Sequence, residues 1–538
     1  MNAFVRSSCI SFAILSSVLI SVSAAPLGRA DATRLLEQST FGPTDALVAH
    51  VQSVGVQGWL DEQFAAPVSR YPSFAYVPPD AAKYCAANPD PQCARDNYSL
   101  FLLQNAFFRN ALAGPDQLRQ RVAFALSQIL VTSGVVIHVP YGMAPYQQIF
   151  LDHAFGNFED VLTRVTLSPT MGDYLNMVNN DKPRPGVSPN ENYARELMQL
   201  FTIGVWELKP DGTQLLDAAG APIPTYSQDA VEGFAHVFTG WTYAPVPGAT
   251  SHNHNPKYFG ADMLAVPLEH DFDAKVLVED VPDAPGKPMG SDLAFALHTV
   301  LMHPNVGPFI GRQLIQKLVT GDPSPQYVAR VAAVFDENGV GVRGDLKAVV
   351  VAILTDPEAR GNSKPAAGYG KLREPVLYVA AAARAVGASS DGVFLAQQAR
   401  ALGQDVFNPA SVFNYYPPSY TVPGTGANGP EFALLNASTE INRYNFANAL
   451  AFGTIGPLST LPGATGTSPV WAPLQALAGN TEALVNELDD LLLHGTMGAQ
   501  MHSAIAAAVD AIPASNPLAR AKTAYYLAVT SPQYQVER

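Results

Sequence analysis

The sequence predicts a mainly α-helical fold: a large single helical domain with a small β-hairpin excursion and two long irregular loops. Apolar residues recur at spacings of three and four along most of the 538 residues, which is the period of an amphipathic helix. Strand patterns are confined to one short region. Apolar residues make up 48% of the chain and charged residues only 14%, so a globular fold is expected rather than disorder.

The charge balance of the chain argues against two classes of binding partner. Lys and Arg total 32 against 46 Asp and Glu, which gives a net charge of -14 at pH 7. Binding to DNA or RNA requires a basic surface that neutralises phosphates, so nucleic acid is not an expected partner. An anionic membrane surface is disfavoured for the same reason.

Residues 1–24 are predicted to be a signal peptide. Arg6 supplies a positive start, an apolar run extends from Cys9 to Val22, and small residues favour cleavage after Ala24. A membrane anchor is the alternative, but the run is short and no later stretch reaches about 18 apolar residues. We therefore expect a periplasmic or secreted protein without a transmembrane anchor, whose residues 25–538 form the single domain.

Cleavage would leave two cysteines, Cys85 and Cys93, on either side of a turn-rich loop. In an oxidising compartment such a pair forms a disulfide by default. The alternative, a two-cysteine metal site, would need further ligands nearby, and none is evident.

The predicted elements follow the apolar periodicity in chain order. Helices are expected around Leu35-Leu36, after Thr44, at residues 100–112, 117–129, 158–167, 292–302, 307–318, 326–335 and 346–354, and in an Ala/Leu-rich set from Pro473 onward. Two strand-like runs around Pro210-Asp211-Gly212 predict a hairpin within residues 205–225. Residues 242–291 and 407–431 lack periodicity, and irregular segments of this length are usually functional.

Residues 188–204 predict a well-capped helix. Ser188 is suited to the N-cap, Pro189 to the first helical position, and Glu191 to a capping box. Gly204 can end the helix in a left-handed conformation. Glu191 also lies four residues before Arg195, in the favourable order for an ion pair.

Asn192 and Glu196 are four residues apart and so lie on the same side of this predicted helix, away from its buried face. Glu196 is the candidate catalytic acid or base, with Arg195 or Arg121 holding its charge state, and Asn192 is a candidate substrate ligand. The alternative is a core helix in which Glu196 and Arg195 form a buried ion pair whose loss unfolds the protein.

The second candidate segment covers residues 227–241. On a helix, Asp229, Glu232 and His236 fall on one face. A carboxylate one turn before a histidine can orient the ring and raise its basicity, so His236, oriented by Glu232, is the second candidate for proton transfer. Trp241 is a candidate stacking wall for substrate. The alternative is a surface or buried histidine that forms a hydrogen bond with Glu232 and has no catalytic role.

The loop that follows is rich in metal-ligand residue types. His252 and His254 form a His-x-His pair, and His270 precedes Asp271. A divalent metal is conceivable here, although the sequence requires no cofactor; His270 and Asp271 could also bind substrate. Tyr415 and Tyr416, on a proline-rich loop, offer flat faces to a sugar ring, or else pack back onto the core.

Several long segments, in order, carry a family resemblance. They are LRQRVAFALSQI, NENYARELMQLFTIG, GFAHVFTGW, HDFDAK, and PASVFNYYPPSY followed by GPEFALLN. Together they resemble the bacterial family catalogued as domain of unknown function 1800, from ATRLLEQSTFGPT at Ala32 to the C-terminal helices. The resemblance implies a large, mostly helical, exported protein whose genes often neighbour a family similar to sulfatases and alkaline phosphatases. It implies no biochemical activity.

Three functions are therefore open. The first is a hydrolase or lyase that cleaves an extracellular polymer, with a polysaccharide favoured, by carboxylate and histidine acid-base chemistry. The second is a non-catalytic partner or scaffold for a sulfatase- or phosphatase-like exported protein. The third is a metal-dependent enzyme that uses the histidine-rich loop. If the protein is an enzyme, its centre is expected where the 190–196 helix, the 232–241 helix and the His270-Asp271 loop meet.

Overall fold

Helices dominate the computed structural model, which describes residues 27–361 and 368–538. The mainly α-helical prediction is confirmed. The predicted signal peptide lies outside the described residues. Within the described part of the chain, no helix is both long enough and apolar enough to cross a membrane.

The first half of the described chain forms twelve helices. They are α1 (Arg29–Ser39), α2 (Asp45–Ala65), α3 (Ala81–Ala87), α4 (Cys93–Asn97), α5 (Phe101–Ala113), α6 (Gln117–Ser127), α7 (Pro140–His153), α8 (Phe158–Leu167), α9 (Pro169–Tyr174), α10 (Asn192–Gln199), α11 (Gln228–Val237) and α12 (Met289–Met302).

The second half of the described chain forms twelve more. They are α13 (Val306–Leu318), α14 (Pro325–Asp336), α15 (Leu346–Thr355), α16 (Pro357–Arg360), α17 (Pro375–Ala385), α18 (Val393–Ala401), α19 (Ala437–Phe452), α20 (Ala472–Leu477), α21 (Thr481–Leu493), α22 (Ala499–Asp510), α23 (Pro517–Val529) and α24 (Pro532–Gln535).

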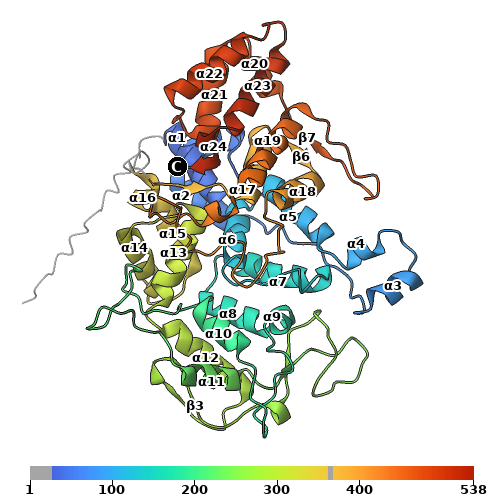
Figure 1. The fold of residues 1–538 in the computed structure, drawn as a ribbon, viewed down its shortest axis with the longest axis vertical. Coiled ribbons are helices and arrows are strands. Elements are labelled where there is room, and N and C mark those ends of the chain that lie inside the picture. The colour runs from blue at the N-terminus through green and yellow to red at the C-terminus, as the bar shows by residue number, and fades with distance from the viewer. Residues whose placement is uncertain (1–26, 362–367) are drawn as a thin grey trace, which may run out of the picture.

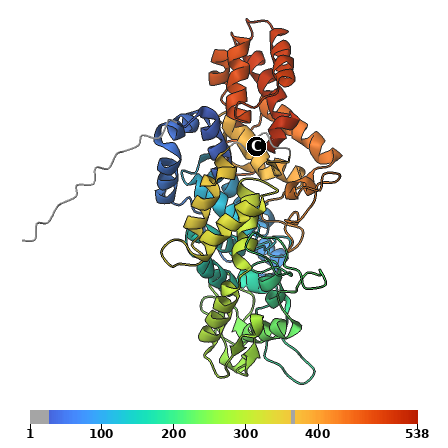
Figure 2. The ribbon, with the colours of Figure 1, turned by 90° about the vertical axis from the view of Figure 1, so that its left-hand side faces the viewer.

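The helices are arranged along one long axis (Figure 1). Helices α20 to α23 form one end, with α1 packed against α21, and α8 to α12 lie at the other. Figure 2 shows the same elongated arrangement from the side. One contiguous hydrophobic cluster, from Ala32 to Tyr534, runs through these layers, so the helices share a single core.

The described strands are short and pair antiparallel in twos. The pairs are β1 (Trp241–Thr242) with β2 (Leu264–Ala265), β3 (Lys275–Val276) with β4 (Pro282–Asp283), β5 (Lys371–Leu372) with β8 (Val536–Glu537), and β6 (Ser389–Ser390) with β7 (Thr467–Ser468). They fasten loops and the C-terminus to the helical body.

The predicted hairpin excursion and the two irregular loops are present. Residues 205–224 fold back through isolated bridges such as Leu208 with Gln214 and Leu216 with Pro222. Asn305 holds this excursion, because its side-chain amide accepts a hydrogen bond from the Leu208 N–H (2.9 Å). Only short strands and 3₁₀ turns interrupt residues 243–288, and residues 403–429 contain no helix.

The predicted disulfide is also present. Cys85 in α3 is bonded to Cys93 at the start of α4, with the Cα atoms 5.7 Å apart. Cys93 is buried, whereas α3 has no buried residue, so the bond holds a peripheral helix against the body.

Candidate functional site

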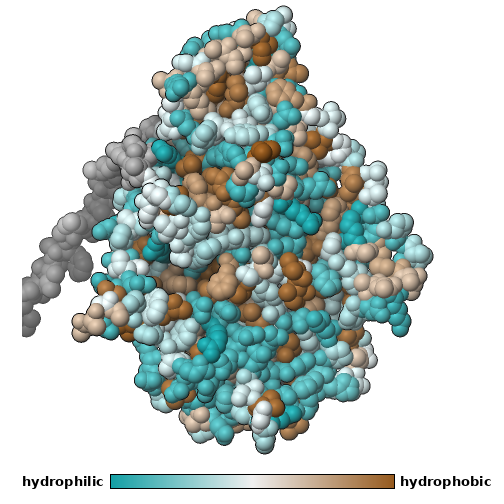
Figure 3. Space-filling model, in the orientation of Figure 1, coloured by the Kyte–Doolittle hydropathy of each residue, from teal (hydrophilic) through white to brown (hydrophobic). Residues whose placement is uncertain are grey.

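The three segments expected to form a centre do meet. Helices α10 and α11 pack against each other, and α11 also contacts α12 and β3, at the lower end of the molecule in Figure 1. Figure 3 shows that this end of the visible face is predominantly hydrophilic. The local sequence explains how each polar side chain reaches this surface.

The start of α10 corrects the predicted cap. The N-cap is Glu191, not Ser188, and its side chain makes no capping bond, so the predicted capping box is wrong. The Asn192 N–H instead donates to the Asn190 side chain (2.9 Å), and the Asn190 N–H donates to Asn180 Oδ1 (2.8 Å). These bonds hold residues before the helix in an extended path. Gly204 does adopt the predicted left-handed conformation, with φ of 75°, but α10 already ends at Gln199, so Gly204 does not end the helix.

That extended path forms one wall of a polar recess of about 490 Å³. The recess is lined by Asn179, Asn180, Asp181, Val187, Ser188, Pro189, Asn190, Glu191 and Asn192. Its other wall is fixed to β1, because the Asn179 N–H donates to the Trp241 carbonyl (2.7 Å) and the Gly240 N–H donates to the Asn180 carbonyl (2.8 Å). Asn192, a predicted substrate ligand, therefore lines an open polar site.

A polar network continues from the recess onto α11. The predicted ion pair is confirmed, with Arg195 Nη2 2.6 Å from Glu191 Oε2. The same Arg195 nitrogen donates to Gln228 Oε1 (2.8 Å), and Gln228 Nε2 donates to Glu191 (3.1 Å) and to Glu232 (3.3 Å). Glu191 thus belongs both to the recess and to this network.

The same face of α11 ends in a histidine–aspartate pair. His236 Nδ1 lies 2.5 Å from Asp271 Oδ2. The prediction that Glu232 orients His236 is wrong, because the loop after His270 brings Asp271 to the ring, and exposed Glu232 instead accepts a hydrogen bond from Gln228. The Asp271 side chain is 7% exposed and that of His236 is 30% exposed. A buried carboxylate therefore holds one ring nitrogen while the ring itself reaches solvent.

Backbone and hydroxyl contacts fix the aspartate. The Asp271 N–H donates to Thr239 Oγ1 (2.9 Å), and that hydroxyl donates to the His236 carbonyl (2.6 Å). The Asp273 N–H donates to Asp271 Oδ1 (2.8 Å). Both carboxylate oxygens of the buried Asp271 thus have hydrogen-bond partners within the protein.

Glu196 lies on a different side of α10. It is half-buried, and its Oε2 is buried without a hydrogen-bond partner. Burial raises the pKa of Glu196, and the nearby Arg195 charge offsets only part of this effect. Burial and the Glu196 charge together raise the pKa of Tyr174, at the end of α9, to about 12. Arg195 itself bonds Glu191, so the predicted buried Glu196–Arg195 ion pair does not form.

Arg121 is remote from Glu196. Its side chain is fully buried, and its Nη2 donates to the Lys317 carbonyl (3.2 Å). Burial lowers the pKa of Arg121 despite the carboxylates around it, of which Glu374 is one. The predicted role of Arg121 in holding the charge state of Glu196 is therefore wrong.

Three aromatic side chains expected to stack on substrate are turned inward. Trp241 is 6% exposed within β1, and Tyr416 is 3% exposed with its hydroxyl donating to Glu374 Oε2 (2.7 Å). The Tyr415 hydroxyl donates to the Asp405 carbonyl (2.5 Å). Tyr416 thus packs onto the core, as in the alternative interpretation, and Tyr415 is half-buried.

The three histidines proposed as metal ligands do not converge. His254 is exposed and bonds Asp181 through Nε2 (2.7 Å), and His252 is exposed as well. His270 is buried, with Nδ1 on a backbone carbonyl (2.8 Å) and Nε2 on Asp292 (3.2 Å). Across residues 27–361 and 368–538, no group of three His, Cys, Asp or Glu is arranged to hold a metal ion.

One wall of the recess, which is formed by Asn179, Asn180 and Asp181, was not identified from the sequence. Asn179, Asn180 and Asp181 follow a helix in a polar, proline-flanked run, which reads as an ordinary turn. Two positive-φ asparagines, Asn176 (59°) and Asn179 (57°), shape that turn. Asparagine adopts positive φ more readily than most other residues with a side chain. The asparagines of this run were therefore the one sequence feature that could have indicated the turn.

A family model described as Protein of unknown function (DUF1800) matches residues 34–536. This match confirms the resemblance drawn from the sequence segments. No curated protein and no solved structure matches the chain.

Proposed function

We propose that this chain, which belongs to the DUF1800 family, is an exported hydrolase or lyase that cleaves an extracellular polysaccharide. The observation that carries this proposal is the His236–Asp271 pair at the end of the polar face of α11. Cleavage of a sugar polymer needs one group that gives a proton and another that takes one. A histidine held by a buried carboxylate is suited to this task.

In this proposal each ring nitrogen of His236 has a separate role. In the neutral imidazole, Nδ1 donates its hydrogen to the Asp271 carboxylate, which leaves Nε2 as the basic nitrogen. Nε2 can then take a proton from water in a hydrolase, or from a sugar carbon in a lyase. The imidazolium that forms is stabilised by Asp271.

Glu232 is our candidate for the second proton-transfer group. It lies one turn before His236 on the same helix face, and it is exposed. A carboxyl group there can protonate the leaving oxygen while His236 acts on the other side of the bond. Arg195 and Gln228, bonded to each other beside Glu232, offer further polar contacts to sugar hydroxyls.

The polar recess before α10 is the proposed binding site for the polymer. Amide side chains such as Asn192 both donate and accept hydrogen bonds, as sugar hydroxyls require. Glu191 joins the recess to the network on α11, so a bound chain would extend toward His236. Export is supported by the predicted signal peptide and by the Cys85–Cys93 disulfide, because disulfides persist in oxidising compartments.

The other two functions stay predictions. The dispersed positions of His252, His254 and His270 offer no geometric support to a metal-dependent enzyme. A partner or scaffold role finds support in the hairpin excursion, where Trp206 and Leu216 are 39% and 49% exposed.

An activity assay tests the proposal. The mature protein is incubated with a panel of neutral and acidic polysaccharides, and new reducing ends are measured. We expect cleavage of at least one polysaccharide, a rate lower by roughly 10²–10⁴-fold in His236→Ala, and a melting curve that shows this variant to be folded at the assay temperature. His50→Ala is the matched control, because it removes another partly exposed histidine paired with a carboxylate (2.6 Å to Glu62). A wild type that cleaves nothing, or a fully active His236→Ala, contradicts the proposal.

A further inference from the structure

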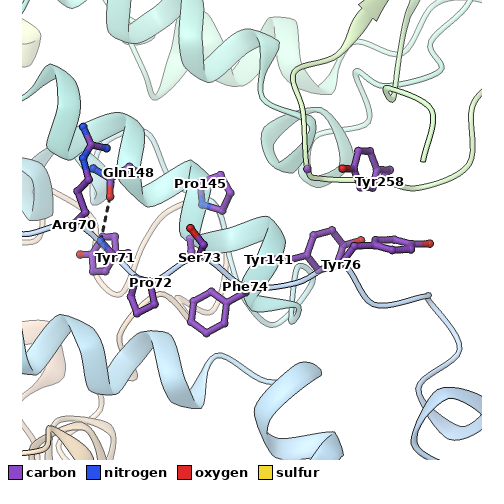
Figure 4. A pocket seen from close by; sticks show the side chains of 12 residues that line it. Arg70, Tyr71, Pro72, Ser73, Phe74, Tyr76, Tyr141, Pro145, Gln148 and Tyr258 are labelled. Atoms are coloured by element: carbon purple, nitrogen blue, oxygen red, sulfur yellow. Dashed lines mark hydrogen bonds between the residues drawn. The ribbon is translucent and has the colours of Figure 1, made fainter. Parts of the chain in front are cut away.

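A second recess, of about 420 Å³, is lined by aromatic side chains from three distant parts of the sequence (Figure 4). Tyr71, Phe74 and Tyr76 come from the extended segment between α2 and α3. Tyr141 comes from α7, and Tyr258 from the long loop between β1 and β2. None of these side chains takes part in the candidate site described above. We call this recess the tyrosine pocket.

The rings of the tyrosine pocket support one another. Tyr76 makes edge-to-face contacts with Tyr141 and with Tyr258, each with ring centroids 5.4 Å apart. Tyr141 and Tyr258 are tilted by 31° to each other at 6.5 Å. Tyr141 is buried, whereas Tyr76 and Tyr258 are half-buried, so parts of both rings remain open to a ligand.

Hydrogen bonds and a glycine fix these positions. The Tyr71 N–H donates to Gln148 Oε1 (3.1 Å), as the dashed line in Figure 4 shows. Gln148 Nε2 in turn donates to Asp152 (3.1 Å). A Cβ on Gly260 would lie 2.2 Å from the Tyr258 hydroxyl, so a side chain at residue 260 would require the Tyr258 ring to move. The pocket is therefore formed before any ligand arrives.

The charge of the pocket indicates a neutral ligand. Among the described residues that line it, Arg70 alone is charged, and an ion pair with Asp152 (2.8 Å) neutralises it. Hydroxyl groups from the tyrosines and Ser73, with the Gln148 amide, offer hydrogen bonds without net charge. The volume falls within the range of small-molecule sites, about 300–1,000 Å³.

We propose that the tyrosine pocket binds a neutral sugar residue of a polysaccharide chain. A pyranose ring presents a C–H face that packs on aromatic rings and hydroxyls that bond polar side chains, and the pocket offers both. This inference rests on the proposed function, of which it names the substrate class. A neutral sugar lacks the carboxylate that a lyase needs to acidify the carbon, so the reaction would be hydrolysis.

The long loop links this pocket to the candidate site. Tyr258 lines the tyrosine pocket, and His254, four residues earlier, bonds Asp181 in the polar recess. Four residues of extended chain span at most about 14 Å. The loop therefore keeps the backbone of a residue that lines the tyrosine pocket within this distance of the backbone of a residue bonded to the polar recess.

Binding measurements on intact protein test the inference. Calorimetric titrations use the His236→Ala background, so that the ligand stays whole, and the probes are cellohexaose, xylohexaose, mannohexaose and a galacturonic acid hexamer. We expect at least one neutral hexamer to bind, with Kd raised at least tenfold in Tyr76→Ala and in Gly260→Ala. Tyr444→Ala, which removes an exposed tyrosine from α19, is the matched control and should leave Kd unchanged. Melting curves check that each variant is folded.

The outcomes separate this inference from the proposed function. Binding that survives in both pocket variants, binding of the acidic hexamer alone, or no binding at all overturns the tyrosine pocket. A proline-rich decapeptide is an additional probe, and its binding in place of every saccharide also overturns the inference. Neutral hexamers that bind through the pocket, while the wild type cleaves no polysaccharide, would support the pocket and reject the proposed function.

Discussion

At the scale of single residues, the carboxylate that contacts His236 in the folded protein is Asp271. The sequence indicated Glu232 as the orienting carboxylate because it lies four residues before His236 on the same helix. Asp271 lies 35 residues away along the chain, and only the folded loop brings it to 2.5 Å. The types of residue and the meeting of their segments could therefore be predicted, whereas the pairing between them could not.

The same limit applies to the other candidate residues. The Glu191–Arg195 pair was predictable because its i,i+4 spacing is a local property of the helix. Tyr416 and Trp241 were wrongly expected to be exposed, because an aromatic residue near a loop has the same sequence signal whether it faces solvent or core. Burial of that kind depends on distant elements.

The raised pKa of Glu196 gives a prediction about stability. A carboxyl group with a raised pKa in the folded state stabilises it fully below the unfolded value, about 4.3, and loses this contribution as pH rises through the folded pKa. Glutamine does not titrate, so Glu196→Gln does not lose stability at this residue as pH rises. The free energy of unfolding of Glu196→Gln, relative to wild type, should therefore rise between about pH 4 and pH 7 in urea titrations. A relative stability that does not change with pH, or a variant that fails to fold, contradicts this account of Glu196.

At the scale of elements, amphipathic helices such as α8 and α14 were predicted, whereas α7 and α17 were not. Helices α8 and α14, for example, each bury one face, and their apolar spacing indicated them directly. Helix α17 is buried at nearly every position, so its apolar residues show no period of 3.6. Helix α7 contains an internal proline, Pro145, which normally argues against a helix.

The loops divide in a similar way. Composition predicted that both segments are irregular, but it did not predict where in the fold they pack. The 243–288 segment supplies Asp271 to the candidate site and Tyr258 to the tyrosine pocket. By contrast, the 407–431 loop turns Tyr416 onto buried Glu374 and contributes structure. Two segments with the same sequence signal thus have different roles.

At the scale of the whole molecule, a buried ionic cluster ties the two ends of the chain to its centre. Glu37 in α1 bonds both Arg373, next to β5, and His494 at the end of α21. Arg373 also lies 3.1 Å from Glu537 in β8. Burial alone would raise the pKa of Glu37, but the Arg373 charge and the contact with His494 outweigh it, and the pKa is lowered.

This cluster predicts the effect of Glu37→Gln. Removing one partner of a buried ion pair typically costs about 3–5 kcal/mol, so the free energy of unfolding in urea should fall by roughly that amount at neutral pH. A lowered pKa gives stability that is present above the unfolded value, about 4.3, and is lost as pH falls through the folded pKa. The difference from wild type should therefore shrink between about pH 5 and pH 3. Glu62→Gln, at an exposed pair, is the control, and equal stability of wild type and Glu37→Gln would refute the prediction.

The central claim is that His236 and Asp271 act as one proton-transfer unit in the cleavage of a polysaccharide. A double-mutant cycle on the cleavage rate tests it most directly. Because Asp271 is proposed to act only through His236, His236→Ala and the His236→Ala/Asp271→Asn double variant should share the same residual rate, and Asp271→Asn alone should also be slow. Losses that multiply in the double variant, or an undiminished rate in Asp271→Asn, would contradict the claim.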